Sequence, residues 1–314
     1  MSIPQLILSP MAGITDAPTR FIAIQNGADD TISEMITSQS QFWDSDKSRW
    51  RFKNVTSEAT SVIQIAGADP LSIASAAAYV AAQGASAVEI NMGCPAKKVC
   101  NVLAGSALLK DEALVEAILT AAVQAVKIPV YLKTRLGWSA EHQNIANIAA
   151  IAEYNGIQRL TIHGRTREQL YKGEASYQLI RQVKRQVSIP VYANGDITTP
   201  EKAGEVLDYT ACDGLYIGRG ALGQPWLFGQ IRDYLTSGNY VPKDDRSELQ
   251  AMILQHIQLI HQHYGEYMGV RIARKHLKWY LQANIAMFKS DFNGFAKLLT
   301  SVEQLDFINR LQFV

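Results

Sequence analysis

Eight short apolar stretches, each followed by a helix-like segment, are the feature that most constrains the fold of this chain. They are rich in β-branched residues and recur at a steady interval: QLILSP from residue 5, TISEM from 31, SVIQIAG from 61, AVEIN from 87, PVYLKTR from 129, RLTIHGR from 159, IPVYANG from 189 and GLYIGRG from 214. Segments such as DPLSIASAAAYVAAQ and DEALVEAILTAAVQAV lie between them and have the composition of helices. Eight strands alternating with helices over about 240 residues predict an α/β fold, a (β/α)8 TIM barrel. A doubly wound open sheet is the alternative, but the count of eight and the lack of a GxGxxG turn after the first strand favour closure.

The pattern changes after the stretch YLTSGNYVPKDDRSE. Gly238, Pro242 and the pair Asp244 and Asp245 indicate a linker and the start of a helix, and we find no strand pattern after them. We therefore predict two domains: a barrel over residues 1–240 and a small all-helical domain over residues 241–314.

Composition predicts an ordinary globular enzyme of the cytoplasm. The 314 residues are 47% hydrophobic and 19% charged, and the net charge of +1 gives no general attraction to nucleic acid or to anionic lipid. The three cysteines form no CxxC pair, so we expect neither a structural zinc site nor an iron–sulfur cluster. The first residues have no basic region of the kind that begins a signal peptide, and no apolar run approaches membrane-spanning length. We also expect a monomer.

Polar, titratable or glycine residues follow all eight predicted strands. Because the carboxyl ends of the strands of such a barrel meet at one rim, these residues are expected to lie together there, where enzymes of this fold have their active sites. In chain order they are Pro10 and Met11, Glu34, Gln64, Asn91 and Cys94, Lys133 and Arg135, His163 and Arg165, Asn194 to Asp196, and Gly218 and Arg219.

The last two strands run into glycine-containing turns, YANGDI and YIGRGALGQPW. Backbone N–H groups in such turns can face an anion with no Cβ in the way, and Arg219 adds a fork for two phosphate oxygens. Phosphate sites in these barrels often follow strands seven and eight, so we predict a phosphate site here. Tight turns alone are the alternative.

A basic stripe is predicted in the C-terminal segment. Its four residues are spaced i, i+3, i+4 and i+7 on one helix: Arg271, Arg274, Lys275 and Lys278. Such a stripe could follow a phosphate backbone, or it could be an ordinary solvated helix face. We interpret His256, His261 and His263, which lie at mixed spacing, as surface or packing residues and not as a metal site.

Several motifs together resemble those of the tRNA-dihydrouridine synthases, most closely the bacterial B-type. They are SPMAGITDAPTR, INMGCPAKKV with AGSALLKD, KTRLGW, TIHGRTREQLYKGEA, IPVYANGDI and IGRGALGQPWLF, and the helical segment adds GVRIARKHLKWYL. The resemblance covers the whole chain. It implies an FMN-dependent oxidoreductase that uses NADPH to reduce a specific uridine in tRNA to 5,6-dihydrouridine.

The resemblance also implies roles for individual residues. Flavin contacts fall on Pro10, Met11, Ala12, Gln64, Lys133, His163, Asn194, Gly195, Asp196, Gly218 and Arg219. Cys94 matches the cysteine that donates a proton to the reduced base, and Asn91 matches a residue that contacts the uracil. We expect Arg135 and Arg165 on the substrate side, and the basic stripe on the tRNA. After AKKV, where B-type relatives often have a basic residue, this chain has Cys100, Asn101 and Val102, which leaves open how this loop meets RNA.

Other functions fit parts of this pattern. A flavin barrel that reduces a free pyrimidine, of the dihydroorotate type, would use most of the same residues. A non-redox phosphosugar isomerase or lyase would use the phosphate site with Lys133 or Cys94 as acid or base. An RNA-binding protein without activity could also keep the fold.

Overall fold

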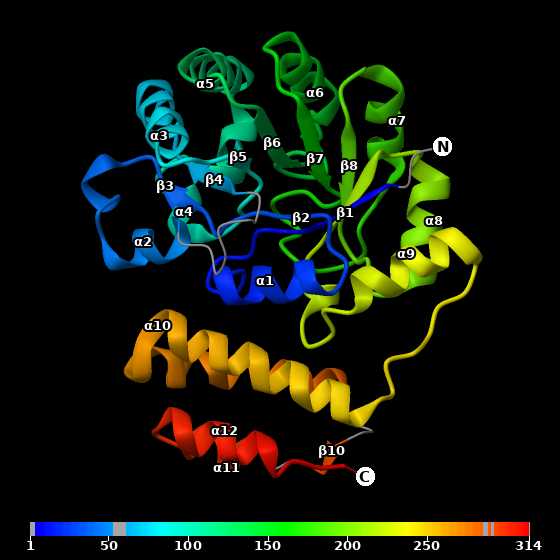
Figure 1. The fold of residues 1–314 in the computed structure, drawn as a ribbon. Coiled ribbons are helices and arrows are strands. Elements are labelled where there is room, and N and C mark those ends of the chain that lie inside the picture. Colours follow the sequence, from blue (N-terminus) through cyan, green and yellow to red (C-terminus); the bar gives the residue numbers. More distant parts are fainter. Residues whose placement is uncertain (1–3, 53–60, 285–287, 290–291, 314) are drawn as a thin grey trace.

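The structure is a computed structural model, which describes residues 4–52, 61–284, 288–289 and 292–313. Its main sheet is entirely parallel and its strands follow chain order around the sheet (Figure 1). The strands are β1 (Gln5–Leu8), β2 (Asp30–Thr31), β3 (Ile36–Thr37), β4 (Val62–Ala66), β5 (Ala87–Met92), β6 (Val130–Arg135), β7 (Arg159–His163), β8 (Val191–Asn194) and β9 (Gly214–Ile217).

The sheet closes into a barrel through its second predicted strand, which the structure divides into β2 and β3. β2 pairs with β1, β3 pairs with β4, and between them Ile32 forms a parallel bridge with Val62. β9 pairs with β1 on the other side. The nine strands are therefore the eight predicted ones, with one interrupted, and the prediction of a barrel over an open sheet is confirmed.

Helices cover the outside of the barrel. They are α1 (Ala17–Gln25), α2 (Asp46–Phe52), α3 (Pro70–Ala82), α4 (Lys97–Cys100), α5 (Glu112–Ala125), α6 (Ile145–Tyr154), α7 (Gln178–Gln186), α8 (Pro200–Thr210) and α9 (Leu227–Ser237). The two helices predicted from composition are α3 and α5, and each begins after an aspartate whose side chain accepts a hydrogen bond from the first turn.

Alternate residues of the strands face two different cores. Residues such as Ile63, Ile90 and Leu132 point outward and pack against the helices in one large apolar cluster. The inward residues near the amino-terminal ends form a second, smaller cluster around Tyr192 and Tyr216. Nearer the carboxyl-terminal ends the inward residues become polar, and this change places the polar groups of the barrel at its mouth.

Beyond the barrel, Gly238 ends α9 in a left-handed conformation, and Asp245 caps α10 (Arg246–Ala283). No helix or strand lies between Ser237 and Arg246, the stretch where we predicted a linker. α10 is interrupted at Gly265, whose φ of 73° and ψ of 177° are not helical. Residues on the two sides of Gly265 approach each other, as His256 and His276 do with ring centroids 4.9 Å apart, so the two halves form an antiparallel hairpin.

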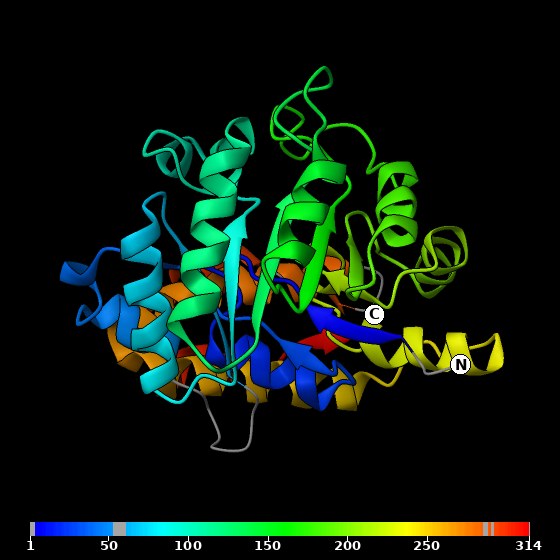
Figure 2. The ribbon, with the colours of Figure 1, turned by 90° about the horizontal axis from the view of Figure 1, so that it is seen from above.

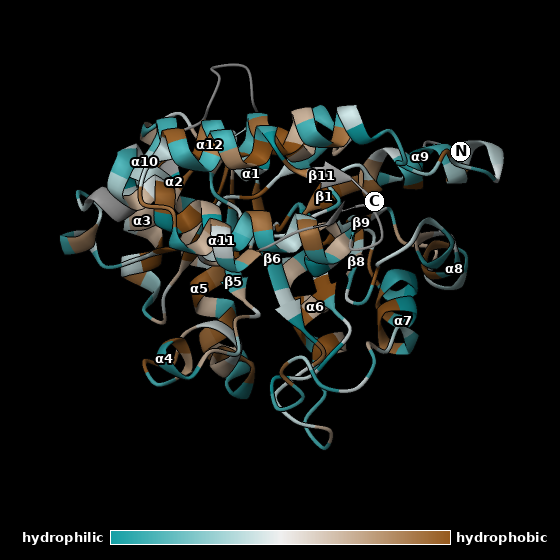
Figure 3. Ribbon diagram, turned by 90° about the horizontal axis from the view of Figure 1, so that it is seen from below, coloured by the Kyte–Doolittle hydropathy of each residue, from teal (hydrophilic) through white to brown (hydrophobic). Residues whose placement is uncertain are grey.

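α10 lies between α1 of the barrel and α12 (Ser301–Asn309), with α11 (Phe292–Lys297) beside it (Figure 1). Figure 2, turned by 90°, shows the same layer passing behind β1 and α1. Hydrophobic and hydrophilic residues alternate along α10 and α12 (Figure 3), as expected for helices that are buried on one side. The buried residues of α10, α11 and α12 form a separate apolar cluster that includes Ile257, Leu277 and Phe295. The prediction that this region contains no strand is wrong. β10 (Phe288–Lys289) and β11 (Gln312–Phe313) form a short antiparallel pair.

Two buried histidines connect this layer to the barrel. The ring nitrogens of His256 lie 3.2 Å from Thr19 Oγ1 on α1 and 3.0 Å from the Tyr280 hydroxyl. Burial lowers the pKa of His256 to about 3, helped by the neighbouring His276, and burial also lowers the pKa of His276 well below its usual value.

This burial predicts that acid destabilises the protein. An unfolded histidine has a pKa of ~6.5, so below that pH the unfolded chain binds more protons than the folded chain. We expect the free energy of unfolding to fall by about 2 kcal/mol from His256 between about pH 6.5 and pH 5, with His276 acting in the same direction, measured by urea unfolding. His276→Gln should reduce this slope, whereas His142→Gln at an exposed position should not. An equal slope in all three proteins would contradict the prediction.

Candidate active site

A cavity of about 970 Å³ opens at the carboxyl-terminal end of the barrel. Almost every residue that the sequence placed at this rim or in the flavin site lines it: Pro10, Met11, Ala12, Gln64, Asn91, Cys94, Lys133, Arg135, His163, Asn194, Gly195, Asp196, Gly218 and Arg219. Glu34 and Arg165 do not line it. The expected juxtaposition of these strand ends is therefore present, although their individual roles remain predictions.

Lys133 is a buried cation of the cavity wall, with 9% of its surface exposed. Its ammonium donates to Asn194 Oδ1 at 2.9 Å, and Asn194 in turn donates to the Tyr216 carbonyl at 2.7 Å. Burial lowers the pKa of Lys133 to about 8, although the Glu89 carboxylate opposes this shift. Lys133 thus keeps most of its charge at neutral pH, and among the described residues a neutral side chain is its one hydrogen-bond partner. It can therefore hold an anionic or carbonyl oxygen.

His163 lies beside Lys133 as a neutral ring. Burial lowers its pKa well below the usual value, and the charges of Arg135 and Lys133 lower it further. Arg165 Nη1 lies 3.3 Å from His163 Nε2. Because a guanidinium can only donate, Nε2 accepts, and the ring proton is on Nδ1.

Arg165 stands behind the wall and positions Asp196. With 2% of its surface exposed, it forms a 2.6 Å ion pair with Asp196 Oδ2 and donates to the carbonyls of Lys172 and Gly173. The same carboxylate oxygen accepts from the Ala175 N–H at 2.8 Å. We expected Arg165 on the substrate side, but its donors are used within the chain, which supports a positioning role for it.

Arg135 ties two loops of the rim together. It donates to the Gly93 carbonyl at 2.7 Å and to the carbonyls of Thr166 and Leu170 at 2.9 and 3.0 Å. Burial lowers its pKa to about 10, so it remains charged at neutral pH. It thereby links the loop that carries Cys94 to the loop that follows β7.

The Cys94 loop is held from both ends. Asn91 Oδ1 accepts from the N–H groups of Gly93 and Cys94 at 3.1 and 2.9 Å, and the Cys94 carbonyl accepts from the Ser106 hydroxyl at 2.9 Å. Gly105 has a φ of +62°, and a Cβ there would lie 2.7 Å from the Cys94 carbonyl oxygen. Burial raises the pKa of the half-buried Cys94 thiol, which keeps it protonated at neutral pH.

The opposite side of the cavity carries the glycine turns. Gly195 has a φ of +128°, and a Cβ there would lie 2.8 Å from the Ala175 Cβ, so no other residue fits without displacement. Gly218 precedes a short 3₁₀ helix, Arg219–Ala221, which is the kind of element that supports phosphate binding in such barrels.

Tyr171 is a cavity residue that the sequence did not reveal. It is 55% exposed, and the Arg219 guanidinium carbon lies 4.8 Å from the centre of its ring. The only signal was an aromatic residue in the otherwise polar loop REQLYKGEA.

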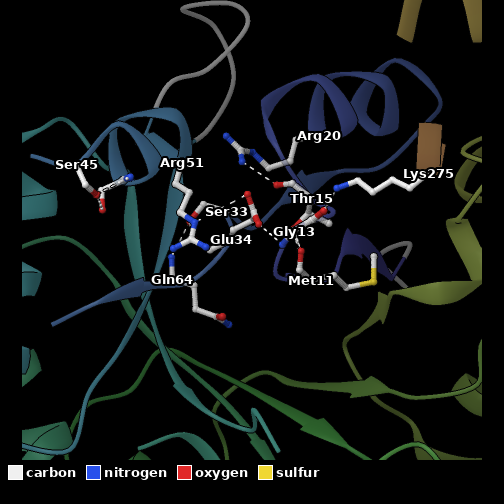
Figure 4. Close-up of polar contacts among 11 residues, drawn as sticks. Met11, Gly13, Thr15, Arg20, Ser33, Glu34, Ser45, Arg51, Gln64 and Lys275 are labelled. Atoms are coloured by element: carbon white, nitrogen blue, oxygen red, sulfur yellow. Dashed lines mark hydrogen bonds and ion pairs between the residues drawn. The ribbon is translucent and has the colours of Figure 1, made fainter. Parts of the chain in front are cut away.

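The loop after β1, which lines the cavity through Met11, is fixed at Gly13 (Figure 4). The Gly13 N–H donates to Glu34 Oε1, and the Gly13 carbonyl accepts from the Lys275 ammonium of α10. Lys275 therefore attaches the helical layer to the active-site loop.

The predicted basic stripe does not form one surface. Arg274 donates to the Leu298 carbonyl at 3.1 Å on the opposite side of α10 from the barrel, while Lys275 faces the barrel. Arg271 and Lys278 are exposed. Only these last two remain placed as a surface that could meet a polyanion.

In the residues that the structure describes, no group of three His, Cys, Asp or Glu side chains could hold a metal ion. No helix in this part of the chain is both long and apolar enough to cross a membrane. His256 and His261 are buried within the helical layer.

The Arg165–Asp196 pair leads to a stability prediction. Arg165→Met would leave the partly exposed Asp196 with Arg219, 3.6 Å away, as its remaining ion pair, and would leave the Lys172 and Gly173 carbonyls without their donor. We therefore expect it to lower the free energy of unfolding by about 3 kcal/mol. Lys202→Met, which breaks the exposed 3.0 Å pair with Glu205, should cost less than about 1 kcal/mol. Chemical denaturation of both variants measures the difference, and equal losses would show that the buried pair has no special role.

Comparison with known proteins places the chain in a family. A family model described as "Dihydrouridine synthase (Dus)" matches residues 7–312. The chain is 49% identical over 304 residues to tRNA-dihydrouridine synthase B of Salmonella typhimurium, which covers 96% of this chain and 95% of that protein. It is 50% identical over 305 residues to tRNA-dihydrouridine synthase B of Shewanella oneidensis, with 97% and 94% covered. Among solved structures, histamine dehydrogenase from Rhizobium sp. 4-9 matches with a TM-score of 0.54 at 13% identity, over 81% of this chain and 49% of that one, which supports the barrel fold alone. The chain belongs to the dihydrouridine synthase family.

Proposed function

We propose that this chain reduces a uridine in tRNA to 5,6-dihydrouridine, with FMN bound in the cavity, NADPH as the reductant and Cys94 as the proton donor. The observation that carries the proposal is the arrangement at the barrel mouth, where a protonated thiol on a fixed loop faces the same cavity as Lys133, His163 and the glycine turns. Family membership supports the reaction, because the relatives are named for it.

The residues present fit FMN. A cavity of about 970 Å³ has room for a flavin mononucleotide together with a pyrimidine. Gln64, Lys133 and His163 would hold the polar edge of the ring, and Pro10, Met11 and Ala12 would lie against it. Gly195, Gly218 and Arg219 would hold the phosphate, with Asn194 and Asp196 orienting that side.

When bound, a reduced flavin supplies the hydride that adds to the carbon β to the uracil carbonyl. The enolate that results needs a proton at the α carbon, and a thiol that burial keeps protonated can supply it. Asn91 holds the backbone of Cys94, and Lys133 stabilises negative charge near it. Each of these residues acts from a rigid element, so the thiol needs no large movement.

The alternatives lose support. The family model does not describe a phosphosugar isomerase or lyase. A free pyrimidine as substrate would leave the helical layer without a function, whereas a tRNA gives it one. We assign the flavin to residues 1–240 and contacts with tRNA to the barrel mouth together with residues 241–314.

A uracil inside folded tRNA must leave its stack to enter the cavity, which requires contacts with the RNA backbone. Arg271 and Lys278 are exposed cations of the helical layer, and neither has an acidic partner at salt-bridge distance among the described residues. We propose that they contact phosphates. Lys275, which donates to the Gly13 carbonyl, would instead maintain the loop.

Cys94→Ala tests the reaction. We expect the purified variant to stay yellow and to oxidise NADPH at the wild-type rate, because Cys94 takes no part in flavin binding. Dihydrouridine formation should fall by about 100-fold or more, as expected for loss of a general acid. Dihydrouridine is mapped in tRNA from cells that lack the gene and carry either form. A colourless wild-type protein, or full activity of the variant, would contradict the proposal.

Charge reversal tests the RNA contact. Arg271→Glu combined with Lys278→Glu should weaken tRNA binding by about tenfold or more at low salt, with a smaller effect at high salt. Lys127→Glu with Arg185→Glu makes the same change of charge at the other end of the barrel, on exposed residues just before β6 and β8, and should weaken it far less. Filter binding at two salt concentrations gives the affinities. Equal losses in the two double variants would refute a specific role for the helical layer.

A further inference from the structure

Glu89 is a fully buried carboxylate inside the barrel that the proposed reaction does not use. It lies on β5, two residues before Asn91, so both side chains point into the barrel. Glu89 Oε1 accepts from Gln64 Nε2 at 2.7 Å, and Oε2 accepts from the Tyr216 hydroxyl at 2.7 Å. Both of its partners are donors, which suits an ionised carboxylate.

From Glu89 a continuous chain of hydrogen bonds leads to the Cys94 loop. Gln64 donates to Glu89 and accepts from Asn91 Nδ2 at 2.8 Å. Asn91 Oδ1 accepts from the backbone N–H groups of Gly93 and Cys94. We call Glu89, Gln64 and Asn91 the amide relay.

The direction of the amide relay is fixed from both ends. Backbone N–H groups can only donate, so the Asn91 oxygen must face the loop and its nitrogen must face Gln64. Gln64 then presents its oxygen to Asn91 and its nitrogen to Glu89, where an ionised carboxylate can only accept. If the carboxylate were absent, Gln64 Nε2 would lose its acceptor and the Gln64 side chain would be held only by its bond to Asn91, so the support behind Asn91 and the loop would weaken.

The amide relay also determines which hydrogen-bonding group of Asn91 is available to a ligand. Its oxygen is fully used by the loop, so only the second N–H of Nδ2 remains. That nitrogen lies 3.8 Å from the Met35 sulfur, a weak acceptor that also lines the cavity. A carbonyl oxygen of a ligand would replace the sulfur favourably, and an amino group would not.

We propose that Glu89 is a positioning residue: through the amide relay it holds the Cys94 loop and keeps an N–H donor of Asn91 directed at a carbonyl of the bound pyrimidine. The inference rests on the proposed function for the identity of that pyrimidine, but not for the effect on Cys94. Burial raises the pKa of Glu89, while Arg159 and Lys133 oppose the shift and favour the charged form that the relay requires.

Alkylation of Cys94 tests the relay without flavin or RNA. Glu89→Met keeps the bulk but removes the acceptor, and we expect iodoacetamide to modify Cys94 about fivefold faster, because the loop is no longer held against the cavity wall. Glu89→Gln can still accept from Gln64, so its rate should stay within about twofold of the wild type. Peptide mass spectrometry separates Cys94 from the buried Cys100 and Cys212.

Tyr192→Phe is the matched control. It removes a different buried polar group of the barrel interior, the Tyr192 hydroxyl, which donates to Gln5 at 2.5 Å and not to Glu89. The rate of Cys94 alkylation should be unchanged in this variant. If Glu89→Met does not fold, Gln64→Met breaks the relay one step later and should raise the rate in the same way. An unchanged rate in the folded relay variants, or equal rates in Glu89→Gln and Glu89→Met, would overturn the proposal.

Activity gives a second, separate measurement. Measured relative to the rate of flavin reduction by NADPH in the same variant, Glu89→Met should slow uridine reduction by about 10- to 100-fold, the cost of a reacting group misplaced by about 1 Å. Glu89→Gln should recover most of the rate. If the wild type reduced no uridine, the proposed function would fail, while the alkylation result would still decide the role of Glu89.

Discussion

The bridge between Ile32 and Val62 joins the two halves of the interrupted second strand to their neighbours and closes the sheet. Closure is what brings strands that are far apart in sequence to a common mouth. Lys133 and Asn194 are 61 residues apart, yet their side chains are hydrogen-bonded across the interior. Without the bridge, β2 and β3 would be the two edges of the sheet, at opposite ends of the strand order. The residues after β1 and those after β4 share one mouth because of this closure.

Three positively charged side chains are buried at or near the mouth of the barrel. Lys133, Arg135 and Arg165 are all buried, and burying an unpaired ion costs several kcal/mol. The structure satisfies them differently: Arg165 with a carboxylate, Arg135 with backbone carbonyls, and Lys133 with a neutral amide. The two cations without a direct carboxylate partner are those that line the cavity. An electron-rich ligand would stabilise both, which agrees with a flavin and a uracil in that space.

Much of this site could be predicted because parallel strands obey a simple rule. The position of Cys94, Lys133 and His163 after successive strands was enough to place them at one rim. The amide relay was also visible in principle, since Glu89 and Asn91 alternate with aliphatic residues along β5. The basic stripe was placed incorrectly as one surface because spacing gives the angle around a helix but not its neighbours. α10 is packed on two sides, so adjacent residues of the stripe face different partners.

The helical layer is attached to the barrel by several hydrogen bonds. His256 contacts Thr19, Lys275 donates to the Gly13 carbonyl and Asn284 donates to the Gly223 carbonyl at 3.2 Å, so α10 is fastened to the barrel along its length. Gly13 is held at its N–H by Glu34 from the strand side and at its carbonyl by Lys275 from the helix side. The exposed Arg271 and Lys278 therefore keep a fixed position relative to the cavity. Since phosphates of a rigid RNA bound there would also be fixed, the distance between this helix face and the mouth would decide which base can enter. Selection of one uridine would then follow from the attachment of α10 and not from contacts with the base itself.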